Sequence, residues 1–138
     1  MSSQITYIPS ILSENGAHVL RQHSFTRWMS PDLLQATTDF CKNISLLPIY
    51  AECASEHRTR YLFWHPPDGT RYEVRSGRDK ARFEALDKIN AERGWPLLSL
   101  HVNEQNLHSA VWISTDHYGV AVTILKSYGI SPAQRLAE

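Results

Sequence analysis

The sequence is poor in several features that would point to a particular class of protein. Its 138 residues carry 14 Lys and Arg against 14 Asp and Glu, so the formal net charge is zero. A balanced charge provides no global field that would steer the chain toward nucleic acid or an anionic membrane. The longest apolar runs, such as 120–125, are far shorter than the ~18 residues that indicate a membrane span. We therefore expect a soluble protein without membrane attachment.

Cysteine is scarce as well. The chain has two cysteines, Cys41 and Cys53, which are too few for a disulfide framework or a zinc site. The opening residues also lack a basic segment followed by an apolar one, the pattern of a secretory signal. Both absences favour a cytoplasmic setting, in which the two thiols stay reduced and buried.

What the sequence does contain is an internal repeat. Pro48 and Trp64 recur as Pro96 and Trp112, at the same offset along the chain in both cases (48 to 96 and 64 to 112). Self-similarity at a fixed period is typical of supersecondary units that bury their apolar faces against one another. We predict a single domain over 1–138, with repeat units at about 30–77 and 78–129 and partial units at 1–29 and 130–138.

Each unit is predicted to hold one helix followed by three strands. Ser30 can accept hydrogen bonds from the free amides of a new helix, and Pro31 suits the first helical position. Leu34 and Cys41 then lie on one apolar stripe, and alternating runs between polar turns predict the strands. We expect helices at about 30–43 and 79–92, hairpins at 47–53 with 59–64 and at 96–102 with 107–112, and third strands at 70–75 and 118–124.

Three details refine this pattern. The apolar stripes of the two helices align better when the offset is larger by one (34 to 83 and 40 to 89), which implies a one-residue difference in the loop between helix and strand. Residues 17–23 are similar to the third strand of a missing unit, and 5–11 can add an edge strand. Residues 130–134 repeat the helix start of 29–33, so a third helix is predicted to begin there.

Two short motifs of the second unit carry a family resemblance. They are Gly94-Trp95-Pro96 before the hairpin and 110–112 (Ala-Val-Trp) at its end, while 46–48 and 62–64 stand in their place in the first unit. Over about 28–138 the chain resembles the bacterial tandem repeat domain. The resemblance implies an α+β fold with a curved, half-barrel-like antiparallel sheet and helices packed on one face. It also implies an accessory role beside catalytic domains such as serine hydrolases of the β-lactamase type, and no catalytic residue carries over.

A pair of histidines is the one candidate metal site. If 103–106 form a turn, His101 directly opposes His108, with Cβ atoms ~5 Å apart. Two imidazoles at that distance could hold a divalent metal together with Asp116 or His117. The matching positions of the first unit carry no such pair, which favours an ordinary solvated hairpin end. We therefore expect no bound metal and no cofactor.

Aromatic residues offer a second candidate site. Trp64 and Trp112 are predicted at equivalent strand ends, and a tryptophan that recurs in register is most often a core residue beneath a helix. Their alternative role is an aromatic platform for a ligand on the concave face of the sheet. The candidate ligand or interaction contacts are Trp64, Trp112, Trp95, Tyr61 and Arg60.

No constellation in the sequence specifies a reaction. The chain has no G-x-S-x-G or S-x-x-K motif, and Cys53 lies in an apolar segment typical of inert packing. The basic and aromatic stretch 58–82 is interrupted by acidic residues, which disfavours nucleic-acid binding. We expect a non-catalytic binding or protein-interaction module, acting as a homodimer or as an accessory domain of a larger protein. The alternative is a small enzyme or metal-binding protein that uses the histidine-containing hairpin.

Overall fold

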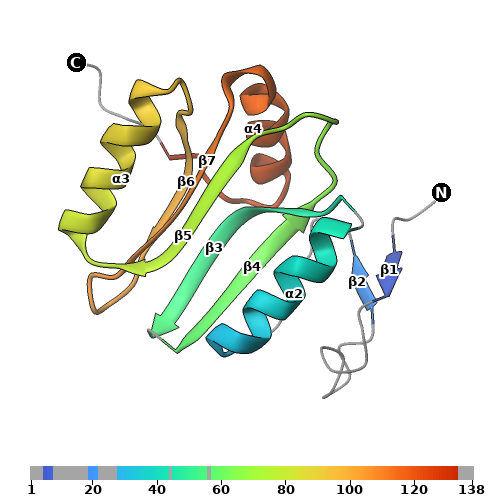
Figure 1. Ribbon diagram of the computed structural model, residues 1–138, viewed down its shortest axis with the longest axis horizontal. Coiled ribbons are helices and arrows are strands. Elements are labelled where there is room, and N and C mark those ends of the chain that lie inside the picture. The colour runs from blue at the N-terminus through green and yellow to red at the C-terminus, as the bar shows by residue number, and fades with distance from the viewer. Residues whose placement is uncertain (1–4, 8–18, 22–27, 44, 56, 134–138) are drawn as a thin grey trace.

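Helices and antiparallel strands alternate along the chain in the computed structural model (Figure 1). The structure describes residues 5–7, 19–21, 28–43, 45–55 and 57–133. Its helices are α2 (Pro31–Asn43), α3 (Lys80–Glu92) and α4 (Tyr118–Ser127), with a short 3-10 helix, Thr115–His117, before α4. Its strands are β1 (Ile5–Tyr7), β2 (Val19–Arg21), β3 (Leu47–Ser55), β4 (Arg58–Trp64), β5 (Tyr72–Arg78), β6 (Leu97–Val102) and β7 (His108–Ile113). The predicted α+β class is confirmed.

The strands of the described residues form separate antiparallel sheets and no closed barrel. β1 pairs with β2, β3 pairs with β4, and β7 lies between β5 and β6. The two larger sheets meet along β3 and β6, where the Ser99 hydroxyl donates to the Ile49 carbonyl at 2.9 Å. On the other side, the hydroxyls of Thr59 and Ser76 lie 3.1 Å apart and join β4 to β5. Side chains thus connect the sheets at both places.

The two longer helices begin in the same way. The Ser30 hydroxyl accepts a hydrogen bond from the Leu33 amide at 3.4 Å, just before α2. The Asp79 carboxylate accepts one from the Arg82 amide at 2.8 Å, just before α3. Each side chain satisfies an amide of the first turn that has no partner within the helix, which explains why the helices start where the sequence predicts.

Both helices also end in the same way. Ser45 follows α2 with φ of 62°, and Gly94 follows α3 with φ of 83°, so both residues adopt the left-handed conformation. This conformation turns the next amide back toward the last helical carbonyls. The resulting hydrogen bonds run from the Leu46 amide to the Cys41 carbonyl and from the Trp95 amide to the Asn90 carbonyl, both at 2.8 Å.

The two halves of the described chain, about 30–77 and 78–129, have matching features, and each feature of the second half is displaced from its counterpart by the same number of residues. α2 and α3 each have 13 residues, and their first and last residues are displaced equally in number (31 to 80 and 43 to 92). In the hairpins, Phe63 pairs with Pro48 and Trp112 pairs with Leu97, which gives the same displacement on both strands (63 to 112 and 48 to 97). Each hairpin has a register shift directly after this pair. The larger offset seen in the helix stripes therefore extends through the hairpins.

The prediction that Trp64 and Trp112 are equivalent is wrong by one residue. At the displacement that the strand pairs share, Phe63 aligns with Trp112, and Trp64 aligns with Ile113. Because successive side chains of a strand point to opposite faces, the two tryptophans lie in different clusters. Trp64 packs in a central cluster next to α4, whereas Trp112 packs against α3.

The predicted third strand of the second unit is also wrong, because 118–127 form helix α4. Val120, Val122 and Ile124 alternate as in a strand, but the fully buried side chains are Ala121 and Leu125. These two residues are four apart, so they share one face of a helix. The third strand of the first unit is confirmed as β5. The two halves therefore differ in their last element.

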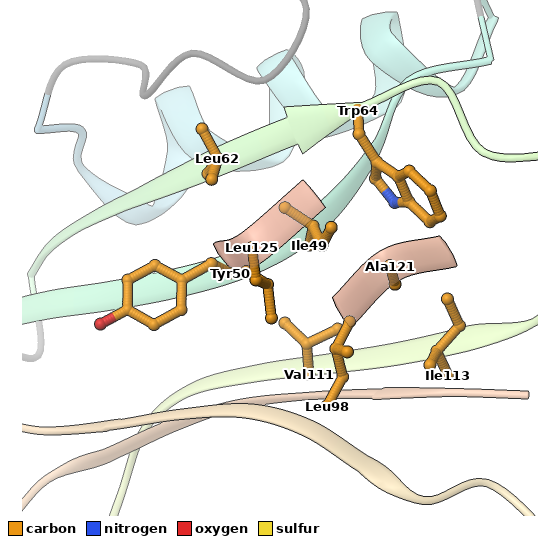
Figure 2. Close-up of a cluster of buried hydrophobic side chains, with 9 residues drawn as sticks. All are labelled: Ile49, Tyr50, Leu62, Trp64, Leu98, Val111, Ile113, Ala121 and Leu125. Carbon is orange, nitrogen blue, oxygen red and sulfur yellow. The ribbon is translucent and has the colours of Figure 1, made fainter. Parts of the chain in front are cut away.

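The helices do not all cover one face, which corrects the predicted layering. α2 packs on the outer face of the β3–β4 hairpin, and α3 packs on the outer face of β6 and β7. α4 instead contributes Ala121 and Leu125 to a central cluster between the two hairpins (Figure 2). The strand residues of that cluster are Ile49, Tyr50, Leu62, Trp64, Leu98, Val111 and Ile113.

Near the N-terminus, the predicted strands 5–11 and 17–23 are represented by β1 and β2, which pair with each other. The other residues of those two predictions lie outside the described residues, as do 134–138 of the predicted third helix. Residues 131–133 are irregular rather than helical. Within the described chain, no helix has the length and apolar character needed to cross a membrane.

Candidate ligand-binding groove

A groove of about 860 Å³ lies between α2 and β5. In Figure 1 the β3–β4 hairpin lies between these two elements, and β4 contributes Thr59 and Tyr61 to the groove. Tyr61 is only 7% exposed, so its ring forms part of the inner wall. The remaining lining residues are Pro31, Leu34, Gln35, Thr38 and Lys42 from α2, 72–76 and Arg78 from β5, and Arg93 and Trp95 after α3.

β5 presents its edge to the groove. Side chains of successive strand residues point to opposite faces, yet all five residues 72–76 line the groove. A continuous run of this kind indicates that the backbone edge, and not one face, borders the space. β5 is also one of the two edge strands of its three-stranded sheet among the described residues.

The lining carries more positive than negative charge. Its cationic side chains are Lys42, Arg75, Arg78 and Arg93, and among the described lining residues Glu73 is the sole carboxylate. Glu73 is held between two of these cations, at 2.8 Å from Arg75 and 2.6 Å from Arg93. Its side chain is 11% exposed, whereas the side chains of Arg75 and Arg93 are 44% and 45% exposed. The positive charge is therefore the accessible part of the groove.

Arg93 is fixed in place by three partners. Its guanidinium lies 3.6 Å from the centre of the Trp95 ring, a cation–π arrangement. The same group donates to the Asn90 side-chain oxygen at 2.7 Å and to Glu73 at 2.6 Å. These contacts connect the end of α3 to β5, so this end of the groove is preorganised.

Two phenols of the groove remain neutral at ordinary pH. Burial raises the pKa of Tyr61 to about 12, the neighbouring Tyr72 adds to the rise, and Arg75 and Arg78 oppose it. Burial also raises the pKa of Tyr72. Arg75 and Arg78 line the same groove as Tyr61.

The structure brings two of the predicted ligand contacts into the groove, namely Tyr61 and Trp95. Trp64 and Trp112 are 2% and 0% exposed, so neither can serve as an open aromatic platform. Arg60 lies outside the groove lining, where it forms an ion pair with Glu52 at 2.9 Å and lies over the Trp28 ring.

The two candidate histidines do not oppose each other, which corrects the predicted register. His101 pairs with Ser109, and His108 pairs with Val102. The loop has five residues instead of four, because the Asn103 side chain accepts from the amides of the residues two and four positions further on. One extra loop residue moves the two histidines to opposite faces of the sheet.

The four predicted metal ligands therefore do not form one site. His101 lies edge-on to Tyr50, and His108 stacks on Phe83 with ring centres 5.0 Å apart. Asp116 and His117 follow the other end of β7, and His117 contacts the Thr70 hydroxyl at 2.9 Å. Within the described residues, no group of three or more His, Cys, Asp or Glu side chains is placed to hold a metal ion.

Sequence reasoning missed most of the groove. Arg75 and Arg78 lie within the basic and aromatic stretch 58–82, which was considered as a nucleic-acid site and disfavoured, and Lys42 and Arg93 were given no role. The available signal was the concentration of arginines between 71 and 82. Nothing in the sequence indicates that β5 lies opposite α2, because that depends on how the two sheets pack.

The cysteines do not add a reactive group to the site. Both are buried free thiols, and burial raises the pKa of Cys41 to about 12, so its thiol stays protonated at neutral pH.

Comparison with known proteins gives no match to a protein family, a curated protein or a solved structure.

Proposed function

We propose that this chain is a non-catalytic binding module whose groove between α2 and β5 binds an acidic ligand. The observation that carries this proposal is the charge of the lining, which contains four cationic side chains and, among the described residues, the single carboxylate of Glu73. Cations gathered around one concave surface repel one another, and an anionic ligand relieves that repulsion while it gains charge-assisted hydrogen bonds. The volume of about 860 Å³ also lies within the range usual for ligand sites.

An enzyme at the histidine-containing hairpin is the weaker alternative. That alternative needs His101 and His108 on one face of the sheet, whereas their pairing puts them on opposite faces. The groove itself contains two tyrosines whose raised pKa values keep them protonated, and its arginines are permanently charged. Such groups bind and orient a ligand more readily than they transfer protons.

We also propose that the two halves are copies of one helix-and-hairpin unit in a half-barrel-like arrangement, as the resemblance to the bacterial tandem repeat domain implies. The common offset of helix ends, strand pairs and register shifts supports this proposal. A homodimer, or docking onto another domain of a larger protein, would cover apolar side chains that stay exposed. These are Ile89, Val102, Val120 and Tyr128.

Binding of acidic peptides tests the proposed function. The probe is a library of octapeptides that carry glutamate at alternate positions and varied residues between, measured by fluorescence polarisation. We expect binding that weakens with added salt, since accessible charges in the groove attract the peptide. Arg78→Gln should weaken the tightest peptide about tenfold through loss of a charged hydrogen bond.

The control is Arg82→Gln, which removes one positive charge from a side chain that is 74% exposed and outside the groove lining. This variant should bind as the parent does. Equal binding of glutamine-substituted peptides, or equal loss in both variants, would contradict an acidic ligand in this groove.

A further inference from the structure

We propose that the acidic ligand is an extended peptide that adds a strand to the outer edge of β5. This inference rests on the function proposed for the groove and specifies how the ligand binds. Addition of a strand to an open sheet edge uses main-chain hydrogen bonds for affinity and alternate side chains for specificity. The groove between β5 and α2 offers both kinds of contact.

The register of β5 shows which of its backbone groups face outward. The Arg71 carbonyl accepts from the Ser114 amide, so residue 71 is directed toward β7. The N–H and C=O of one strand residue point to the same side, and the side alternates along the strand. The register with β7 is regular from residue 72 to residue 75, so residues 73 and 75 are directed toward β7, and Tyr72 and Val74 are directed toward the groove. A register shift between Arg75 and Arg78 interrupts the alternation after that, and there the Ser76 carbonyl is reached by the Arg78 guanidinium.

Arginine side chains occupy two backbone carbonyls of β5. Arg75 donates from its guanidinium to the Val74 carbonyl at 2.9 Å, and Arg78 donates to the Ser76 carbonyl at 3.4 Å. Both guanidinium groups thus take positions that the N–H groups of an added strand would take. When a peptide strand donates to these carbonyls instead, the Arg78 guanidinium and Nη1 of Arg75 become available for its carboxylates, while Nη2 of Arg75 keeps its ion pair with Glu73.

The spacing of the outward groups fits an extended ligand. Tyr72 and Val74 are two residues apart in the regular part of β5, and alternate residues of a strand lie about 6.6 Å apart. An added strand would therefore donate from residues i and i+2. On the opposite side, Gln35, Thr38 and Lys42 lie at helical spacing along α2 and line the groove with polar groups that alternate ligand side chains can reach.

A peptide fits this surface better than single-stranded nucleic acid does. Nucleic-acid strands bind through open aromatic rings on which bases stack, together with a basic track. The Tyr61 ring is 7% exposed and Trp95 is already covered by Arg93, so the groove offers little stacking surface. Its distinctive feature is the backbone edge of β5, which a nucleic acid cannot extend.

N-methylation of the ligand tests the binding mode. The tightest octapeptide from the acidic library is resynthesised with one backbone amide methylated at a time. We expect methylation of residues i and i+2 to weaken binding about tenfold or more, because each methyl group removes a donor to β5. Methylation of the residues between them should change affinity by less than about twofold, since their amides point away from β5.

Amide hydrogen exchange of the protein provides an independent measurement. Bound peptide should slow exchange at Tyr72 and Val74, while Glu73, whose amide is directed toward β7, should be unaffected. Equal effects of methylation at every position would overturn strand addition and leave the acidic groove intact. Displacement of the peptide by short oligothymidylate at equal or lower concentration would identify a nucleic-acid site instead. Failure of every acidic octapeptide to bind would overturn the proposed function itself.

Discussion

Glu73 sets the arrangement of the groove at the scale of single residues. Its carboxylate is 11% exposed and lies 2.8 Å from Arg75 and 2.6 Å from Arg93. A nearly buried carboxylate is stable only when its charge is paired, and here two guanidinium groups share that role. Glu73 thus fixes two cations at the mouth of the groove while leaving a net positive charge for a ligand.

Tyr61 should make the stability of the protein sensitive to alkaline pH. Burial raises its pKa in the folded state to about 12, above the usual value near 10. The contribution of the protonated Tyr61 hydroxyl to the free energy of unfolding is therefore fully present below about pH 10 and is lost as pH rises toward about 12. Over this pH interval, the free energy of unfolding should fall by roughly 2 kcal/mol less in Tyr61→Phe than in the parent protein. Urea unfolding at several pH values measures it.

Tyr128→Phe provides the matched control, because Tyr128 is 45% exposed at the end of α4. Its pH profile should follow that of the parent protein. If both variants give the same profile as the parent, the Tyr61 hydroxyl is not held in a buried environment.

At the scale of elements, the two helix ends allow a direct comparison of glycine and serine in one conformation. Ser45 has φ of 62° and Gly94 has φ of 83° at matching positions. A left-handed backbone costs a residue with a side chain about 1–2 kcal/mol. Ser45→Gly should therefore stabilise the protein by about 0.5–1 kcal/mol, and Gly94→Ala should destabilise it by about 1 kcal/mol.

Chemical denaturation measures both changes. A Cβ on Gly94 would meet nothing within 4 Å, so the expected loss comes from backbone conformation and not from a steric clash. The Ser45 carbonyl oxygen lies 3.1 Å from His65 Nδ1, and glycine at this position keeps that oxygen. Changes of the same sign in both variants would contradict this account.

Much of the secondary structure follows from local sequence signals. Helices α2 and α3 were predictable because Ser30 and Asp79 mark their starts and apolar residues recur at helical spacing. The hairpins were predictable because alternating runs flank polar turns. The prediction failed at 118–124, where alternation suggested a strand but Ala121 and Leu125 pack as one face of a helix. Only tertiary contacts distinguish these two patterns.

The candidate site was less predictable than the elements. Hydrogen bonds to the Asn103 side chain close a loop between β6 and β7 that is one residue longer than predicted, and this difference places the two histidines on opposite faces of the sheet. The equivalence of Trp64 and Trp112 failed for a similar reason, since an error of one residue reverses the direction of a strand side chain. The groove depends on the packing of one sheet beside another, for which the sequence carries no local signal.

At the scale of the whole molecule, we expect a homodimer formed through an end of the sheet. Val102 is the last residue of β6 and is 43% exposed, so a second copy would cover an apolar side chain there. Sedimentation equilibrium at micromolar concentration should give twice the 15.8 kDa mass of one chain. Val102→Ser should shift the protein toward monomer. A single 15.8 kDa species for the parent would contradict the dimer.

The guanidinium groups on the β5 carbonyls have a consequence for the protein without ligand. An uncovered sheet edge is a template for uncontrolled pairing between molecules and thus for aggregation. Arg75 and Arg78 occupy acceptors of that edge with like charges, which repel the same edge of another molecule. We therefore expect the side chains that would bind an acidic strand also to disfavour aggregation of the free protein through the β5 edge.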